Sequence, residues 1–207
     1  MLEAALLALA AQAMQVGAVP KRLPPVDRCR DADFIEFRSE LRSAIARKDE
    51  DALLGLLAED VLVDFGGGQG RLAFAEAWEI GAEADSRVWE ELKQALEYGC
   101  APAGDALVSP SFVAQAPPGI DAFETVIAIP LTRLKTEKSN FAPGLANLDW
   151  HVASVTDDSD ADWLGVTLAD GRRGYVRRNQ VIQLLDYRLT FEKRDGKWAI
   201  AAFVAGD

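Results

Sequence analysis

The feature that most constrains this fold is the segment 162–176, in which two apolar runs flank a tight turn. In the first run, Leu164 and Val166 fall on one face of an extended strand, the period-two pattern of a strand with a buried side. Asp170 and Gly171 follow, and Asp-Gly between apolar runs indicates a hairpin because primed turns require positive φ. The chain is therefore expected to contain an antiparallel β-hairpin here.

Other short strands are predicted around this hairpin. Two β-rich runs lie upstream, at 124–129 and 151–156, and a polar, Lys-rich loop separates them. Several short strands at close spacing predict a small sandwich or barrel. A second hairpin is predicted near the C-terminus, where residues 187–191 alternate and Asp195-Gly196 forms the turn. The sequence leaves open whether this closing hairpin extends the barrel or packs on the N-terminal region.

The order of these pieces resembles the bacterial SH3-like (SH3b) domain, a five-stranded barrel, over roughly residues 123–185. Residues 131–138 depart from the usual R-x-x-P-S segment after the first strand, which leaves the type of ligand open. The closing hairpin also resembles, more weakly, the last strands of cone-shaped α+β domains of the nuclear transport factor two-like class. The SH3-like resemblance is carried by Asp162, Trp163, Val166, Leu168, Asp170, Gly171, Gly174, Tyr175 and Val176.

The N-terminal half has helical periodicity. Apolar residues recur at spacings of three and four from Phe34 to Ile45, which predicts an amphipathic helix with Asp33 as its N-cap. Further helices are predicted over 51–57, around 72–78 and over 88–96, the last capped by Asp85 or Ser86. A short strand is predicted at 61–65, and the glycines of 66–70 end it.

These patterns predict an α+β protein with a helical N-terminal domain, a small all-β SH3-like barrel and a closing β-hairpin. Residues 101–119 carry four prolines and are the expected domain connection. The expected division is 1–27, a signal-like apolar segment and linker, then 28–119, a mainly helical domain, then 120–207, the barrel with the hairpin. The length of 207 residues is sufficient for two small domains.

Charge limits the classes of partner. The net charge of −11 argues against a nucleic-acid partner, whose phosphates require a basic surface, and against adsorption to an anionic membrane. A local basic cluster is either a solvated hairpin rim or a contact for an anionic ligand. It consists of Arg172, Arg173, Arg177 and Arg178.

The first residues bear on localisation. Residues 4–13 are apolar and end in Ala11-Gln12-Ala13, the small-x-small pattern of a signal-peptidase site, although Glu3 stands where a basic residue is usual. The run is too short to span a bilayer. We expect a periplasmic or secreted protein, and a cytoplasmic one if this run is an ordinary helix. In an oxidising compartment Cys29 and Cys100 would pair, whereas in the cytosol they would be separate thiols.

No catalytic or cofactor motif of comparable quality is found. The one histidine, His151, lies in a predicted strand, and Cys29 lacks the flanking residues of Cys-His peptidases. The loop 66–70 lacks the Lys-Ser/Thr of a phosphate-binding loop. The acidic run 157–162 lacks the glycine and final glutamate of a calcium loop. We therefore expect no catalytic residue, no metal and no cofactor.

Three functional hypotheses remain. The first is an exported, non-catalytic binding protein whose barrel holds a peptide, a peptidoglycan fragment or another protein in an aromatic groove. The second is a cone-like α+β domain with a pocket for a small apolar ligand and the barrel inserted. The third is a hydrolase, which would need an acid pair in that pocket. The expected ligand-binding residues are Trp150, Tyr175 and Trp163 in the first hypothesis, and Trp78, Trp89 and Phe65 in the second.

Overall fold

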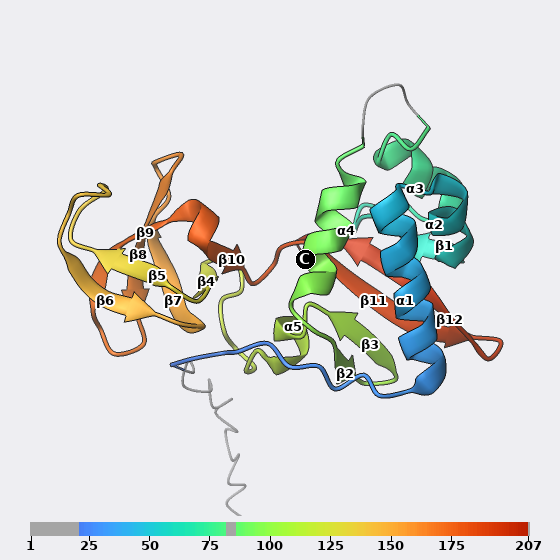
Figure 1. The fold of residues 1–207 in the computed structure, drawn as a ribbon, viewed down its shortest axis with the longest axis horizontal. Helices are drawn as coiled ribbons and strands as arrows, with labels where there is room; N and C mark the ends of the chain where they lie inside the picture. The colour runs from blue at the N-terminus through green and yellow to red at the C-terminus, as the bar shows by residue number, and fades with distance from the viewer. Residues whose placement is uncertain (1–20, 82–85, 207) are drawn as a thin grey trace, which may run out of the picture.

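The computed structural model describes residues 21–81 and 86–206, which form two β-sheets with separate buried cores (Figure 1). Most of the signal-like segment and Asp85 lie outside the described residues. The α+β class expected from the sequence is confirmed. We call the part with the five-stranded sheet and the α-helices the α+β unit, and the part with the seven-stranded sheet the β unit.

The helices lie where the apolar periodicity predicts them. Asp31, not Asp33, caps the first helix, because its carboxylate accepts a hydrogen bond from the Phe34 amide at 2.9 Å while Asp33 lies in the first turn. Arg87 is the N-cap of the fourth helix, and the Ser86 hydroxyl accepts from the Val88 amide at 3.2 Å. The described α-helices are α1 (Ala32–Arg47), α2 (Glu50–Leu56), α3 (Arg71–Ala77), α4 (Val88–Glu97) and α5 (Phe112–Gln115).

The five-stranded sheet of the α+β unit has the order β1-β12-β11-β3-β2. β1 pairs in parallel with β12 and the other neighbours are antiparallel. Residues 101–119, expected to be a domain connection, instead supply β2, β3 and α5. Pro102 is tolerated because β2 is an edge strand. The strands are β1 (Leu57–Leu62), β2 (Ala101–Ala103), β3 (Ala106–Ser109), β11 (Arg188–Arg194) and β12 (Lys197–Val204).

Aromatic side chains fill the core between this sheet and the helices. Phe34 of α1 and Phe191 of β11 are fully buried, and their rings meet edge to face at 5.1 Å. Phe37 lies 5.9 Å from Phe191, and Phe74 and Phe203 extend the cluster toward α3. α1 and α4 lie against the same face of the sheet and contact each other (Figure 1).

A disulfide joins Cys29 to Cys100, with Cα atoms 5.7 Å apart. It links the chain just before α1 to the chain just after α4, across a sequence separation of 71. The backbones pair at the same place, since the Arg28 amide donates to the Cys100 carbonyl at 2.7 Å and the Cys100 amide to the Val26 carbonyl at 3.0 Å. The N-terminal end of α1 and the C-terminal end of α4 are thus held together.

The β unit is an antiparallel sheet of order β10-β4-β7-β8-β9-β5-β6, inserted in the chain between β3 and β11. The hairpin predicted at Asp170-Gly171 is confirmed as the β8–β9 turn, where Gly171 has φ +84°. A 3₁₀ helix, η1 (Arg178–Gln180), precedes the last strand. The strands are β4 (Thr125–Ala128), β5 (Thr132–Lys135), β6 (Gly144–Leu148), β7 (His151–Asp157), β8 (Trp163–Leu168), β9 (Arg173–Arg177) and β10 (Val181–Gln183).

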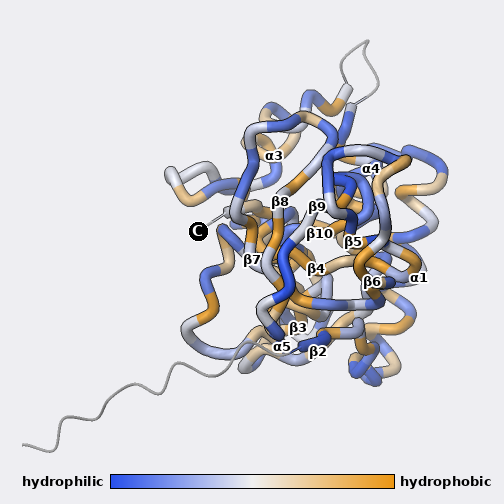
Figure 2. Tube along the Cα trace, turned by 90° about the vertical axis from the view of Figure 1, so that its left-hand side faces the viewer, coloured by the Kyte–Doolittle hydropathy of each residue, from blue (hydrophilic) through white to orange (hydrophobic). Residues whose placement is uncertain are grey.

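Small aliphatic residues form the core of the β unit, among them Leu134, Leu148 and Val166. Gly174 has a specific role in this packing, because a Cβ there would lie 2.5 Å from the Lys135 carbonyl oxygen. Its lack of a side chain lets β9 approach β5. Figure 2 shows hydrophobic residues along strands such as β4 and β7 and mostly hydrophilic connecting loops.

A third apolar cluster joins the two units. Phe112 of α5 and Leu23 of the N-terminal segment are buried with Ile127 and Val152 of the β unit. The segment that begins at residue 21 also pairs with the start of β7, since Arg22 forms a β-bridge with His151 and the Leu23 amide donates to the Trp150 carbonyl at 2.8 Å. This apolar contact fixes the two units against each other.

The closing hairpin β11–β12 belongs to the five-stranded sheet, which answers the question that the sequence left open. Its Asp195-Gly196 turn has positive φ at both residues, as the sequence predicts. β1 begins at Leu57, earlier than the predicted strand 61–65, because the backbone pairs with β12 from the Leu57–Ile200 position onward. The N-terminal and C-terminal parts of the chain therefore build one unit, and the β unit lies between them in sequence.

Candidate functional site

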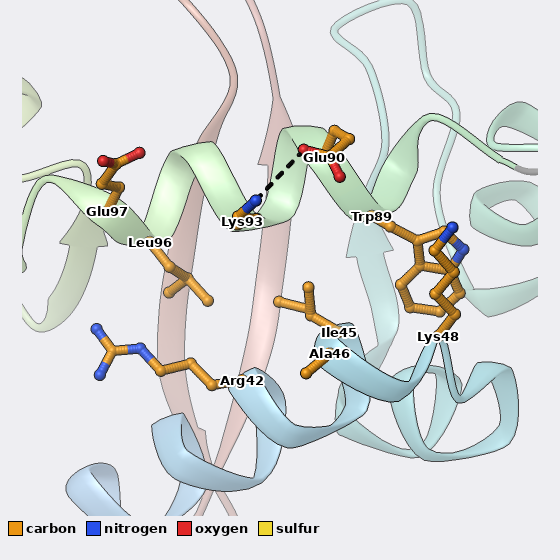
Figure 3. A pocket seen from close by; sticks show the side chains of 9 residues that line it. All are labelled: Arg42, Ile45, Ala46, Lys48, Trp89, Glu90, Lys93, Leu96 and Glu97. Atoms are coloured by element: carbon orange, nitrogen blue, oxygen red, sulfur yellow. Dashed lines mark ion pairs between the residues drawn. The ribbon is translucent and has the colours of Figure 1, made fainter.

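A groove of about 750 Å³ lies between α1 and α4, and we call it the α1–α4 groove (Figure 3). Its floor is formed by Ile45 and Ala46 of α1 and by Trp89 and Leu96 of α4. Ile45, Trp89 and Leu96 are almost fully buried, so they present only their edges to the groove, whereas Ala46 is exposed. A mostly apolar concavity of this volume is typical of small-molecule sites.

The groove exists because the two helices use different parts of their surfaces. Phe34 and Leu41 of α1 and Leu92 of α4 point to the sheet and are fully buried. The helix sides that face each other carry the small Ala46 and long charged side chains. Because alanine does not fill the space between the helices, an apolar channel remains along them.

Charged side chains flank this floor. Lys93 pairs with Glu90 on α4 at 3.7 Å, so these two charges largely cancel. Glu97 extends away from α1 in Figure 3. Arg42, at the end of the groove near Leu96, forms no ion pair with any residue of the described ranges 21–81 and 86–206. The groove thus combines an apolar floor with a rim cation, Arg42, that no described carboxylate pairs with.

A smaller cavity of about 250 Å³ lies beside Arg87, at the N-terminal end of α4. The Arg87 guanidinium is 5.7 Å from the Trp78 ring centroid and 5.8 Å from that of Tyr187, and it donates to the Tyr187 hydroxyl at 3.2 Å. The Trp78 indole N–H is buried and has no hydrogen-bond partner within the described part of the chain. Glu91, one turn into α4, has a pKa raised by burial and by the Asp186 carboxylate.

The structure does not bring together the three aromatics predicted to line one pocket. Trp89 borders the α1–α4 groove and Trp78 borders the smaller cavity. Phe65 is 51% exposed, and its ring lies beneath the Arg188 guanidinium at 5.6 Å. Sequence patterns predict each helix but not which sides of two helices face each other, so the groove residues Arg42, Ala46 and Leu96 were missed.

The three aromatics predicted to bind a peptide also lie apart. Trp150 lies between the units, against Tyr98 at 5.9 Å and Phe112 at 6.0 Å. Trp163 is buried beneath the Arg177 guanidinium, 4.6 Å from its ring centroid. Tyr175 is half-buried and contacts the Lys138 ammonium.

The acidic run 157–162 uses its carboxylates to hold its own loop. Asp160 accepts hydrogen bonds from the Asp162 and Trp163 amides, and Asp158 pairs with Arg178. The hydrogen bond from Lys138, together with those from Ser159, holds the Asp157 pKa well below its usual value. Among the described residues, no cluster of three or more acidic, His or Cys side chains could hold a metal ion.

The other candidate catalytic features have structural partners. The Asp64 carboxylate accepts from the Gly66 and Gly68 amides at 2.6 and 3.1 Å, so the glycine loop binds its own aspartate. The His151 Nδ1 atom lies 3.0 Å from the Asp149 amide nitrogen. Cys29 is in the disulfide and has no free thiol.

In the described residues, no helix combines the length and apolar composition needed to cross a membrane.

No protein-family model and no curated protein sequence matches the chain. Among solved structures, it is similar to a putative ketosteroid isomerase from Shewanella frigidimarina, at 10% identity over 85% of this chain and 96% of that one, with a TM-score of 0.32. An NTF2-like protein of unknown function from Pseudomonas putida matches at 10% identity over 83% and 82%, with a TM-score of 0.30. One from Shewanella oneidensis matches at 15% over 84% and 97%, with a TM-score of 0.29. At these scores the likeness does not establish a shared fold.

Proposed function

We propose that this protein is an exported, non-catalytic binding protein whose α+β unit holds an elongated apolar molecule with one acidic end. The α1–α4 groove is the proposed site. The observation that carries the proposal is an apolar channel of about 750 Å³ with one cation, Arg42, that no described residue neutralises. Apolar contact would supply most of the affinity, and the guanidinium would orient the acid group.

The architecture of the α+β unit supports a ligand-binding role. Helices cover one face of a sheet whose central strands, β12 and β11, come last in the chain. This is the arrangement expected for a cone-like NTF2-like domain with an inserted β unit. In the β unit, the β8–β9 hairpin lies where the SH3-like resemblance expects its Asp-Gly turn, which is the observation that favours that resemblance. The only described carboxylic acid with a raised pKa, Glu91, does not line the groove.

Export is supported by the Cys29–Cys100 disulfide. Such bonds persist in the periplasm and outside the cell, whereas cytosolic thiols are kept reduced. We therefore propose that the protein resides in an oxidising compartment. Measuring the free-thiol content of the protein isolated from its native cells tests this placement, and two free thiols per chain would contradict it.

Titration with dodecanoate, below its critical micelle concentration, tests the binding function. Because a ligand that binds only the folded state stabilises it, dodecanoate at one hundred times its Kd should add about 2.7 kcal/mol to the free energy of unfolding. Calorimetry gives the Kd, and thermal unfolding gives the stabilisation. Absence of both binding and stabilisation would contradict the proposal.

Two tryptophan substitutions on α1 locate the site. Ala46→Trp places an indole in the groove and should abolish dodecanoate binding. Ile35→Trp places the same group on the same helix at a partly exposed position outside the groove, and binding should persist. Equal loss of binding in both variants would mean that the ligand does not occupy the groove.

A further inference from the structure

A second concave surface lies on the β unit, beside β5 and the end of β9. It has a volume of about 590 Å³, and we call it the β5–β9 groove. Leu131, Arg133 and Lys135 line it from one side. Arg133 and Lys135 alternate with Thr132 and Leu134, which are fully buried, so the period of an extended strand places both cations on the open face. Leu131 directly precedes the strand.

No carboxylate lines this groove, although the chain as a whole has a net charge of −11. Arg133 is exposed and forms no ion pair among residues 21–81 and 86–206. The Lys135 ammonium donates to the backbone carbonyls of Asn140 and Ala142 at 3.0 and 2.8 Å. Neither acceptor is charged, and an ammonium has a third N–H to offer.

Arg177 supplies the third cation from β9. Its guanidinium stacks over the buried Trp163 ring, and its Nε donates to the Asn140 side-chain oxygen at 3.1 Å. An Asp162 oxygen lies 3.3 Å away, outside the groove lining, and neutralises part of its charge. Arg177 is thus held in place, while Arg133 and Lys135 carry most of the available positive charge.

Apolar side chains are exposed at the same groove. Leu131 is 87% exposed and has φ +71°, a backbone conformation that leucine rarely adopts. Phe141 is 99% exposed and directly follows Asn140 of the groove lining. Exposed apolar groups beside a cationic groove favour a partner that carries both acidic and apolar side chains.

The geometry points to the β5–β9 groove as a binding site for an extended acidic peptide with carboxylates at alternate positions and an apolar side chain between or beside them. Residues two apart on an extended strand are about 7 Å apart, so Arg133 and Lys135 match the spacing of carboxylates at i and i+2 of a peptide. Asn179 and Gln180 of η1 also line the groove, and their side-chain amides can bind peptide backbone. This site does not depend on the function proposed for the α1–α4 groove.

Fluorescence anisotropy with a labelled peptide of sequence GELEGELEG tests the inference on the full chain. We expect saturable binding that weakens with added salt, because the contacts are charge-assisted and partly exposed. The glutamine-substituted peptide GQLQGQLQG should bind at least about tenfold more weakly. Failure of the acidic peptide to bind the wild-type protein would overturn the inference.

Charge-reversal variants separate this groove from the rest of the basic cluster. Arg133→Glu should weaken binding of the acidic peptide by about tenfold or more. The matched control, Arg172→Glu, makes the same charge change at the tip of the β8–β9 hairpin, where Arg172 pairs with Asp170, and should change the Kd less than about twofold. Both side chains are exposed, so neither variant threatens folding. Equal losses of peptide affinity in the two variants would show that the peptide responds to the general electrostatic field of the β unit and does not bind in the β5–β9 groove.

A single-stranded oligonucleotide of the same net charge serves as the competing partner. We expect it to bind at least about tenfold more weakly than the acidic peptide, because the aromatic ring of the groove lining, Trp163, is buried beneath the Arg177 guanidinium and cannot stack on a base. Equal or tighter binding of the oligonucleotide would overturn the assignment of a peptide.

Discussion

The α1–α4 groove and the β5–β9 groove are concave surfaces of comparable size, yet they are lined differently. Between two helices, the side chains available to line a groove are those next to the buried face, so the floor is apolar and charges stand at the rim. Beside β5, alternate residues face solvent, so a row of cations lies directly on the open surface. The secondary structure of each unit therefore limits the chemistry of the ligand that its groove can hold.

The two grooves also differ in how rigidly their walls are held. The helices of the first groove are held by an aromatic core and by the disulfide, whereas the second groove depends on hydrogen bonds to one loop, 136–143. Changes to the core of the α+β unit should therefore affect dodecanoate binding and leave binding of the acidic peptide unchanged.

The largest effect is expected from Phe191→Ala. Removing this fully buried ring, which contacts Phe34 and Phe37, should lower the free energy of unfolding by about 3–5 kcal/mol. Urea denaturation followed by far-ultraviolet circular dichroism measures the loss. The control Phe65→Ala removes a ring that is 51% exposed and should cost less than about 1 kcal/mol. Similar losses in both variants would contradict the placement of the core.

Loss of the disulfide is expected to have the next largest effect. Reduction, or Cys100→Ser, should lower the free energy of unfolding by about 2–4 kcal/mol, because the bond closes a long loop. It should also weaken dodecanoate binding, since the bond links the ends of α1 and α4. Urea denaturation with and without dithiothreitol measures the change. In the Cys29→Ser/Cys100→Ser variant dithiothreitol should have no effect, and wild-type protein insensitive to reduction would refute the prediction.

A smaller effect is expected from Arg42→Gln. This change should weaken dodecanoate binding by about 1–2 kcal/mol, because a charge-assisted contact with the carboxylate is lost. Binding of dodecanol, which has no carboxylate, should be unaffected. The matched variant Arg47→Gln alters the same helix at a residue that pairs with Asp49 outside the groove. Calorimetry measures the affinity of both variants for both ligands. If Arg42→Gln lost as much affinity for dodecanol as for dodecanoate, an acid-binding role for Arg42 would be excluded.

The smallest effect concerns the tip of the β8–β9 hairpin, outside both grooves. The hydrogen bonds from Arg172 lower the pKa of Asp170 to about 2. Because the folded pKa lies below the unfolded value, this contribution to stability is complete above about pH 4 and is lost as the pH falls toward 2. Nuclear magnetic resonance titration of the Asp170 carboxyl carbon should show the pKa rising toward 3.8 in Arg172→Gln. An unchanged pKa would mean that the pair does not form.

Local sequence patterns predicted the elements with local causes. The apolar spacing from Phe34 to Ile45 predicted α1, and the Asp-Gly pairs at 170–171 and 195–196 predicted two hairpins that the structure contains. These features depend on a few neighbouring residues, so a linear pattern is sufficient to find them.

The rest depends on contacts distant in sequence. The parallel pairing of β1 with β12 joins residues more than a hundred positions apart, and no turn signal marks it. The proline-rich residues 101–119 have the composition of a domain connection, and only the pairing of β3 with β11 shows that they belong to the sheet. Likewise, Trp150 and Trp163 have similar local surroundings in sequence, and only the tertiary structure places one between the units and the other beneath Arg177.

The binding sites follow the same rule. Arg133 and Lys135 lie in the segment 131–138, which departs from the usual SH3-like pattern in sequence. That departure marks the position of the β5–β9 groove. No sequence pattern marks the α1–α4 groove, because it depends on which sides of two helices face each other.

Amide chemical-shift mapping during a dodecanoate titration shows where on the protein the ligand binds. We predict shifts of the Ala46 and Leu96 amides and of the Trp89 indole N–H, with the Leu131 and Arg133 amides unmoved. Shifts confined to the smaller cavity at Trp78 and Arg87, or to the β unit, would contradict the assignment of the α1–α4 groove as the site.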